Sequence, residues 1–492
     1  MKIFEDFKNR KYLLGIISIA LIACVLFILK GLFKQEVGFP LDDAWIHQTY
    51  ARNLILQGRW SYSAGTISGG STSPFWTLLL SLGYLFSKTG GITWAFLLSI
   101  CSFVLLELIS CLTIFSYKNI QNKWQALIPG VLIAGEWHLL WSAASGMETT
   151  LFSLGIVFVI YQTLKEKPVW WLIGLISGIL VWIRPDGLTL LGPIFLIFCW
   201  GGVKKEYSWN QLLSFLVPFL VLIGCYIIFN LLTTRNLFPN TFYAKQVEYQ
   251  ELLKTPLFTR FINELTPLLA GSGILILPGF AFEIWQGLRS KNIKMIAFLI
   301  WIVGFIFLYA LRLPVTYQHG RYIFPIIAPF FIFGIVGIFS ILERINSIKS
   351  RNLITTAWMG SLILITAAFY AIGINTYQSD LKIINQLMVQ PAKWTAVNLP
   401  QEDIIAVHDI GAMGYFTQNK IIDLAGLVNP EVIPLMHDEK RLLEYMQTSQ
   451  ANYFIGFSDW YETSNTWGKK VMTFSAIYQN KQEEIEIIQL KK

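Results

Sequence analysis

The stretch 12–33 reads YLLGIISIALIACVLFILKGLF and contains a single charged residue, Lys30. At a rise of about 1.5 Å per residue, about 20 such residues form a helix that crosses roughly 30 Å of hydrocarbon. Basic residues precede the stretch, but it is too long for a signal peptide and no small-residue cleavage motif follows it. We therefore expect a retained first transmembrane helix.

Ten further apolar runs follow this helix and predict a polytopic helical membrane protein with about 11 transmembrane helices. A mean hydropathy of +0.53, with 54% hydrophobic and 14% charged residues, agrees with this class. The further spans are expected at residues 92–116, 125–144, 149–164, 169–183, 187–203, 210–232, 266–287, 293–311, 321–341 and 353–374.

Charge sets the expected orientation of these spans. The net charge of +8 lies mainly in short loops that would all face the cytoplasm together with the basic N-terminus, as the positive-inside rule requires. We therefore expect a multi-pass protein of the plasma or inner membrane with a cytoplasmic N-terminus, and no nucleic-acid partner. The five cysteines show no paired spacing and are expected to be packing residues. The basic loop residues are Lys118, Lys123, Lys165, Lys167, Lys204, Lys205, Arg289, Lys291, Lys294, Arg344, Lys349 and Arg351.

The chain is expected to divide into a transmembrane domain, 1–375, and a small soluble α/β domain, 376–492, outside the cytoplasm. Charge content rises after Asn375 and the apolar runs shorten. We expect strands at 404–407 and 420–424, a turn at 411–414 and a helix at 439–447. Residues 423–430 are expected to form a loop that faces the membrane domain, and a turn role is favoured for His408 and Asp409.

The region 34–91 is expected to form an outer loop with interfacial helices, because 74–87 is apolar but too short to span. This loop begins with the adjacent carboxylates Asp42 and Asp43. Two carboxylates near a bilayer surface are costly to desolvate unless they hold a cation, accept hydrogen bonds or transfer protons. One of them can remove a proton from an attacking hydroxyl, and the alternative is a pair of solvated loop acids.

The loop 34–91 and the second expected outer loop each place small hydroxyl residues and glycine at a helix start. Thr72 and Ser73 precede Pro74, and Glu148 precedes Thr149 and Thr150. Free N–H groups at such positions can bind an anion or a sugar hydroxyl, although simple N-capping explains most of the pattern. Glu148 stands where the chain enters lipid, so its carboxylate needs an interaction partner or a functional role.

Basic residues occur in three more outer segments. Arg184 can bind phosphate with Asp186 beside it, or the two can merely close a turn. Lys245 follows Asn240 and Tyr243 in an aromatic and amide-rich loop, and it suits a lipid phosphate, whereas interfacial anchoring is the alternative. His319 and Arg321 can stabilise a leaving phosphate, or Arg321 can snorkel to the surface. A phosphate loop of the Walker type and a dinucleotide fingerprint are missing from the sequence.

These motifs, taken in order, resemble the GT-C membrane glycosyltransferases that use polyprenyl-phosphate sugars. The similarity extends to the branch of the mycobacterial terminal arabinofuranosyltransferase and covers nearly the whole chain. The stretches that carry it are 42–43, 50–54, 72–79, 145–149, 184–187, 239–245, 321–322, 409–412 and 423–427.

The resemblance implies a function and a set of roles. It implies transfer of a sugar from a polyprenyl-phosphate donor to a glycan, lipid or protein acceptor, with Asp42 or Asp43 as the base. Arg184, Tyr243, Lys245, His319 and Arg321 are then candidates for the donor phosphate. The candidates for the sugar and acceptor are Thr72, Ser73, Glu148, Asp186 and Asn240.

Some questions stay open at this point. Some relatives with a second acidic loop motif bind a divalent metal, and Glu148 stands alone in that loop, so the resemblance leaves a divalent cation open. A lipid-linked sugar transporter is a rival class that predicts internal repeats and interrupted helices, and we detect neither in the sequence. A non-catalytic membrane scaffold is the third class.

Overall fold

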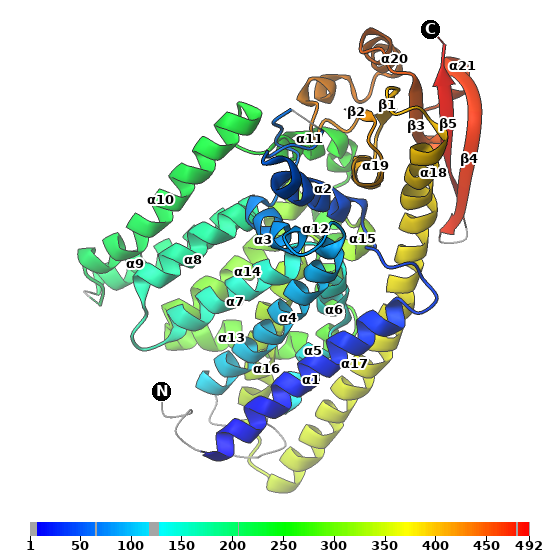
Figure 1. Cartoon of the computed structure of the whole chain (residues 1–492). Coiled ribbons are helices and arrows are strands. Elements are labelled where there is room, and N and C mark those ends of the chain that lie inside the picture. Colours follow the sequence, from blue (N-terminus) through cyan, green and yellow to red (C-terminus); the bar gives the residue numbers. More distant parts are fainter. Residues whose placement is uncertain (1–6, 64–65, 118–126, 205, 479–480, 492) are drawn as a thin grey trace.

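The computed structural model describes residues 7–63, 66–117, 127–204, 206–478 and 481–491. It shows a tilted bundle of helices with a β-sheet at one end, and the N-terminus lies at the opposite end (Figure 1). The mostly helical membrane architecture with a C-terminal sheet confirms the predicted fold class. Of the predicted basic loop residues, Lys118, Lys123 and Lys205 lie outside the described residues.

Seven helical segments in the described part of the chain are long and apolar enough to cross a membrane, and a bent pair raises the number to eight. The pair, α12 (Leu257–Leu269) and α13 (Gly273–Ser290), bends by 108°. The seven segments comprise α1 (Phe7–Gly31), α4 (Gly90–Tyr117), η2 (Pro185–Leu190) with α9 (Leu191–Val203), α10 (Trp209–Thr234), α14 (Ile293–Arg312), α15 (Tyr317–Gly320) through η4 (Phe324–Ile326) to α16 (Ile327–Glu343), and α17 (Ile348–Ile384) through η5 (Asn385–Val389) to α18 (Gln390–Asn398).

The other three of the about 11 expected spans are formed by shorter or interrupted helices. Residues 149–164 and 169–183 form helices, α7 (Thr149–Leu164) and α8 (Trp170–Ile183), of 16 and 14 residues, which are short for a perpendicular span. The predicted span 125–144 breaks into α5 (Ile128–Ala134) and α6 (Trp137–Ala144). The break occurs because the Glu136 carboxylate accepts the N–H of Leu139 and so caps a new helix.

The segment Tyr317–Glu343 lies at the centre of the bundle, as its burial shows: 94% of its most apolar 18-residue stretch is buried. The corresponding share for α10, at the edge of the bundle, is 17%. Glycines let α13 approach α16 closely. A Cβ at Gly279 would lie 2.1 Å from the carbonyl oxygen of Gly334, and one at Gly337 would lie 1.9 Å from that of Gly279. Such contacts between small residues are typical of packed membrane helices.

Two helices of the region 34–91 lie between the bundle and the C-terminal sheet. α2 (Asp42–Gln57) ends at Gly58 in the left-handed conformation, with φ 66°, and α3 (Pro74–Tyr84) begins with a proline at its first position. α3 has 11 residues, which is too short to cross a bilayer, as expected. A third short helix, α11 (Asn240–Glu248), is followed by η3 (Gln250–Lys254).

The C-terminal region contains a five-stranded mixed sheet in the order β2-β1-β3-β5-β4. β1 pairs in parallel with β2 and β3, and β5 pairs antiparallel with β3 and β4. The expected turn at 411–414 is wrong, because these residues lie in helix α19. The elements are β1 (Ile404–Val407), α19 (Ile410–Phe416), β2 (Lys420–Asp423), η6 (Pro430–Leu435), α20 (Glu439–Thr448), β3 (Tyr453–Phe457), η7 (Ser458–Trp460), α21 (Ser464–Trp467), β4 (Gly468–Tyr478) and β5 (Lys481–Leu490).

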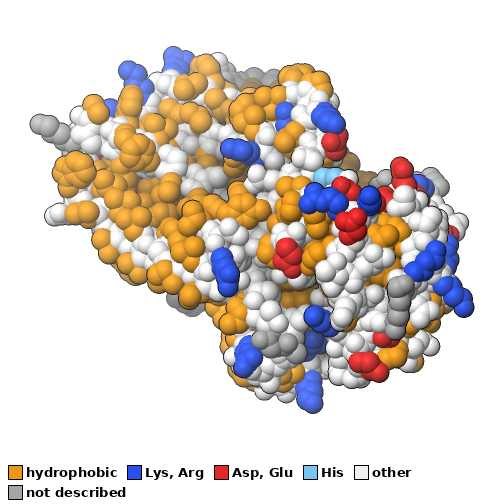
Figure 2. Space-filling model, turned by 90° about the horizontal axis from the view of Figure 1, so that it is seen from above, with side chains coloured by type: hydrophobic (Ala, Val, Ile, Leu, Met, Phe, Trp, Pro, Cys, Tyr) orange, Lys and Arg blue, Asp and Glu red, His pale blue; other side chains and the backbone are white. Residues whose placement is uncertain are grey.

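The surface side chains differ between the helical part and the end that carries the sheet. Figure 2 shows hydrophobic side chains spread over the helical part and Asp and Glu gathered toward the end that carries the sheet, whereas Lys and Arg occur on both parts. The expected domain boundary at 375/376 falls inside α17, which continues through η5 and α18 to Asn398. The division into two domains therefore stays a prediction.

Candidate active site

Asp43, in the first turn of α2, lies between two cations from distant parts of the chain. Arg321 donates from Nη2 to Asp43 Oδ2 at 2.5 Å, and Lys245 Nζ lies 3.4 Å from the same oxygen. The Asp43 side chain is 29% exposed, whereas that of Arg321 is 8% exposed. Burial alone would raise the pKa of Asp43, but Lys245 and Arg321 outweigh it and hold the pKa below its usual value. Asp43 is therefore an ionised carboxylate beside buried cations.

Tyr322 contacts the basic side chains around this carboxylate. Lys245 donates a hydrogen bond from Nζ to Tyr322 Oη at 2.9 Å. The guanidinium carbons of Arg321 and Arg184 lie 5.2 and 5.8 Å from the centre of the Tyr322 ring. Nε and Nη1 of Arg321 are buried and have no hydrogen-bond acceptor among the described residues. Buried N–H groups of this kind usually have partners, so the arrangement suits an anion such as a phosphate.

The ionic state of Lys245 follows from the same contacts. Burial alone would lower the pKa of Lys245, but Asp43 and Tyr322 together hold it above its usual value. Lys245 therefore stays a cation although its side chain is only 15% exposed.

Arg184, at the C-terminal end of α8, forms a second layer behind Tyr322. It pairs with Asp186 through two N–H groups, Nε to Oδ1 at 3.1 Å and Nη2 to Oδ2 at 3.1 Å, and also donates to Tyr309 Oη at 3.0 Å. Arg184 Nη1 lies 3.7 Å from Glu148 Oε1. The Arg184–Asp186 pair that the sequence offered as a turn closure therefore forms, and the same arginine faces Glu148.

His47 joins Glu148 to the Asp43 face of α2, and the sequence analysis missed it. Its Nε2 lies 3.7 Å from Glu148 Oε2, and its Nδ1 lies 3.2 Å from Ser71 Oγ and 3.1 Å from Thr77 Oγ1. Burial lowers the pKa of His47 by more than Glu148 and Asp43 raise it, so the imidazole is neutral near pH 7. Its position four residues after Asp43, on the same helix face, was the available signal.

Asp42 faces the C-terminal region instead. Its two carboxylate oxygens accept the backbone N–H groups of Gly411 at 2.6 Å and Ala412 at 2.8 Å, at the start of α19. Burial and the nearby Asp409 raise the pKa of Asp42, and the two N–H donors limit the rise. Arg52, further along α2, donates to the carbonyl oxygens of Gly414 and Tyr415. Asp42 thus connects α2 to the sheet region.

His319 is held away from Asp43. It forms a hydrogen bond of 2.8 Å with Asp380 of α17, and its ring lies edge-on to Trp141. Gln318 and His319 have φ of 53° and 65°, a left-handed conformation that is costly for residues other than glycine. This strained turn immediately precedes Arg321 and directs it to Asp43.

Other predicted residues of the outer loops lie near this group without contacting Asp43. Ser73 is fully buried and its Oγ has no partner among the described residues, and Thr72 is partly buried. Ser71, beside them in the chain, forms hydrogen bonds with His47 and Thr77, and Ser73 does not cap α3 with its side chain. Asn240, at the start of α11, is 2% exposed with an unpartnered Oδ1.

Two further contacts complete this part of the site. Tyr243 packs edge-on against Phe242. Residues 423–430 pack against Gly70 as expected, since a Cβ there would lie 2.5 Å from a methyl group of Val428.

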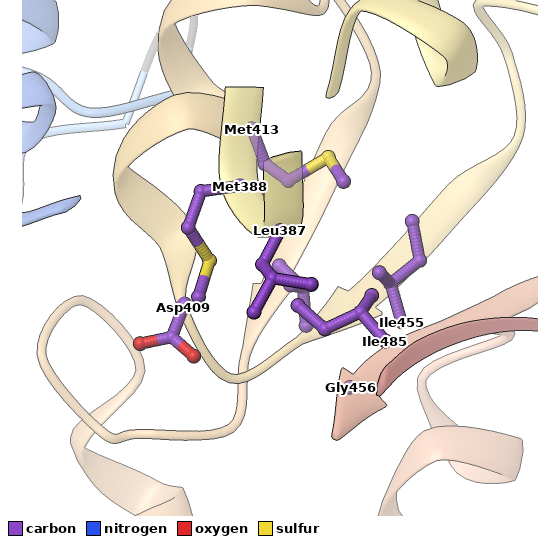
Figure 3. A pocket seen from close by; sticks show the side chains of 8 residues that line it. Leu387, Met388, Asp409, Met413, Ile455, Gly456 and Ile485 are labelled. Atoms are coloured by element: carbon purple, nitrogen blue, oxygen red, sulfur yellow. The ribbon is translucent and has the colours of Figure 1, made fainter. Parts of the chain in front are cut away.

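A second group of titratable residues lies between α11 and the sheet. His408 Nε2 lies 3.9 Å from Glu248 Oε1, and its Nδ1 lies 3.0 Å from Tyr461 Oη. Asp409 borders a small apolar hollow beside η5, α19 and the ends of β1 and β3 (Figure 3). The hollow holds about 10 Å³, which is room for about one water molecule and too small for a sugar. Burial raises the pKa of Asp409 to about 6.

The residues present do not fit a divalent cation. Asp43 is surrounded by Arg321 and Lys245, and the part of the chain that the structure describes has no group of three or more His, Cys, Asp or Glu side chains arranged to hold a metal ion. A bound cation would also have to overcome the charge of both basic side chains.

Sequence comparison matches residues 382–487 to a family model described as a domain of unknown function, DUF8728. No curated protein matches the chain.

Solved structures are similar to a larger part of the chain. ArnT from Cupriavidus metallidurans bound to undecaprenyl phosphate is 12% identical, with a TM-score of 0.58, over 96% of this chain and 98% of that one. The apo oligosaccharyltransferase of Archaeoglobus fulgidus is 13% identical, with a TM-score of 0.59, over 92% and 70%. The oligosaccharyltransferase AglB from the same organism, in complex with an inhibitory peptide and a dolichol-phosphate, is 12% identical, with a TM-score of 0.55, over 97% and 74%. The chain therefore has a GT-C-like fold, with helices through the membrane and a mixed sheet at the C-terminal end.

Proposed function

We propose that the protein is a membrane glycosyltransferase that moves a sugar from a polyprenyl-phosphate donor to a hydroxyl of a glycan, lipid or protein acceptor. The observation that carries the proposal is Asp43 beside Arg321 and Lys245, with unpaired, buried N–H groups on Arg321. The GT-C-like fold supports it, since ArnT is described with undecaprenyl phosphate and AglB with a dolichol-phosphate.

The proposed reaction uses Asp43 as the general base and inverts the anomeric carbon. Asp43 accepts the proton of the acceptor hydroxyl while the hydroxyl oxygen forms a bond to the anomeric carbon. The bond from that carbon to the phosphate oxygen breaks, and its electron pair stays on the phosphate. Arg321 and Lys245 stabilise the charge that develops there, with Arg184 behind Tyr322 adding a third positive group.

Donor binding would also activate the base. Without a donor, Arg321 and Lys245 are paired with Asp43 and keep its pKa low, which makes it a weak base. A donor phosphate competes for the same N–H groups, so the pairing with Asp43 weakens and its pKa rises. Proton abstraction is then favoured only when the leaving group is in place.

The finer assignments belong to the same proposal. The end of the bundle that carries Asp43 and the sheet faces away from the cytoplasm, because the basic loops favour the opposite side. Asn240, whose Oδ1 has no hydrogen-bond partner among the described residues, binds a hydroxyl group of the sugar or the acceptor, together with Glu148, Asp186, Thr72 and Ser73. Tyr243, two residues before Lys245 on α11, is a further candidate for the donor, whereas His319 is paired with Asp380. The sequence resemblance makes arabinofuranose the first sugar to test.

The test is a transfer assay on the purified chain in liposomes, with a panel of polyprenyl-phosphate sugars and simple glycan acceptors. We expect formation of a glycoside and release of polyprenyl phosphate in equal amounts. The double variant Arg321→Gln, Lys245→Gln should lose both products while it remains folded. Movement of the lipid-linked sugar across the bilayer without glycoside formation would identify a transporter and refute the proposal.

A further inference from the structure

A groove lies between α1 and α17, away from the Asp43 site. The two helices run side by side (Figure 1) and are joined by two hydrogen bonds, from Tyr370 Oη to the carbonyl oxygen of Ala23 at 2.8 Å and from Gln378 Nε2 to that of Lys30 at 2.7 Å. The groove has a volume of about 380 Å³, within the usual range for small-molecule sites. Its lining is Leu26, Lys30, Phe33, Tyr370, Ile374, Asn375 and Gln378.

The groove opens on the outer surface of the bundle. Leu26 is 47% exposed and Phe33 is 62% exposed, although both lie in or next to a segment apolar enough to span a membrane. Exposed apolar side chains at this depth face lipid rather than water. The occupant of the groove must therefore be compatible with hydrocarbon.

The polarity of the lining changes along the helices. The hydrogen bond to Ala23 places Tyr370 at the level of the middle of α1, where Leu26 and Ile374 also line the groove. The bond to Lys30 places Gln378 about two turns higher, one turn beyond Asn375. The groove is therefore apolar at the level of Leu26 and Ile374, whereas Lys30, Asn375 and Gln378 give its other end polar groups beside Phe33, as an acyl chain and its headgroup require.

Lys30 supplies the charge at the polar end. It is the only charged residue between 12 and 33, its side chain is exposed, and its ammonium has no acceptor in the described part of the chain. A lysine near a helix end extends its amine toward the headgroups, where it attracts anionic lipids. The groove and this cation together select a negatively charged amphiphile.

We propose that the α1/α17 groove binds one anionic phospholipid, with an acyl chain along Leu26, Tyr370 and Ile374 and the phosphate at Lys30. Asn375 and Gln378 offer amide groups beside the phosphate. Asp380, two residues after Gln378, holds His319 in the strained turn before Arg321. The lipid would thus contact the same helix that supports the Asp43 site, although its binding does not depend on the proposed transfer reaction.

Native mass spectrometry of the full chain with equal amounts of phosphatidylglycerol and phosphatidylcholine tests the site. We expect preferential binding of phosphatidylglycerol, and about a fivefold loss of that preference in Lys30→Gln, the effect of one lysine at an anionic surface. Ile374→Trp, which fills the groove, should reduce binding of both lipids. The matched controls are Lys167→Gln, an exposed loop lysine, and Ile363→Trp, an exposed position of α17 outside the groove.

Photo-crosslinking of the unaltered protein gives a second measurement that no folding defect can affect. A phosphatidylglycerol with a photoreactive acyl chain should label peptides containing residues 21–33 and 370–378 above all others. An unchanged headgroup preference in Lys30→Gln, or labelling spread evenly over the lipid-facing helices, would overturn the proposal. Labelling of the same peptides by a photoreactive polyprenyl phosphate, without competition from phosphatidylglycerol, would replace the phospholipid with the carrier lipid.

Discussion

The two faces of α2 carry the same chemical group in opposite settings. Asp43 meets side-chain cations, Arg321 and Lys245, on the face toward the membrane helices. Asp42, its neighbour, meets backbone N–H groups of Gly411 and Ala412 on the face toward the sheet. Both hydrogen-bond acceptors of Asp42 are occupied by main-chain groups of a packed helix, so it is fixed, whereas a ligand can compete for the partners of Asp43.

The difference teaches which aspartate suits proton transfer. A base must be able to change its partners during the reaction, and charged side chains that also bind phosphate permit this. A carboxylate buried against a helix N-terminus is a structural contact, comparable to a helix cap. We therefore propose catalysis for Asp43 and positioning of α2 for Asp42, and the following changes test that distinction in order of expected effect.

Asp43→Asn should have the largest effect on activity. An amide cannot accept the proton, so the transfer rate should fall by about 10²- to 10⁴-fold. The assay is glycoside formation in proteoliposomes at saturating donor, with the unfolding midpoint as a control for folding. A variant that is stable and retains more than a tenth of the wild-type rate would show that Asp43 is not the base.

Arg321→Gln should reduce kcat/KM by about 10²-fold, the usual effect of losing one strong charge-stabilising donor. It should also move the acidic limb of the pH profile of kcat/KM to higher pH. The reason is that Arg321 lowers the pKa of Asp43 in the free enzyme, so its removal raises that pKa and the base becomes protonated at a higher pH. An acidic limb that does not move would separate Asp43 from Arg321 in function.

Asp42→Asn should act mainly on stability. An asparagine side chain presents one oxygen and one NH₂ group to two N–H donors, so one hydrogen bond is lost and a buried backbone N–H is left without a partner, at a cost of about 1–3 kcal/mol. We expect a lower unfolding midpoint and faster proteolysis of the sheet region, with a smaller loss of rate than in Asp43→Asn. The opposite ranking of the two variants would reverse the assignment of the pair.

The smallest expected effect is a difference in stability between variants of two residues in the loop before α3, Ser71 and Ser73. Ser71→Ala removes hydrogen bonds to His47 and Thr77 and should cost about 1 kcal/mol, whereas Ser73→Ala removes a buried hydroxyl without a partner and should not destabilise the protein. Thermal unfolding of both variants in the same detergent measures the difference. Equal destabilisation would mean that His47 does not depend on Ser71.

The sequence predicted the membrane class and two of the five strands, at 404–407 and 420–424, because apolar runs are local signals, but it did not predict β3, β4 and β5. It could not place the break between α5 and α6, since Glu136 and His138 read as scattered polar residues in a long apolar run. It also could not separate Asp42 from Asp43, because the partners of Asp42 lie 369 and 370 residues away.

The site followed a similar pattern. Arg184, Lys245 and Arg321 stood out in the sequence because charge is rare in such a chain. His319 stood out for the same reason, yet its contact with Asp380 depends on the packing of α17. Ser71 was harder to recognise, since small polar residues are common in loops, and the contact of His47 with Ser71 depends on how that loop packs against α2.

The length of the final membrane helix has a consequence for where the sheet lies. The helical segment Ile348–Asn398 has 51 residues, which corresponds to about 75 Å, while the hydrocarbon layer accounts for roughly 30 Å. The part of this segment beyond the hydrocarbon layer therefore extends above the bilayer and supports the sheet at a set height. The height of the sheet above the bilayer is therefore set by a continuous helix rather than by a flexible linker.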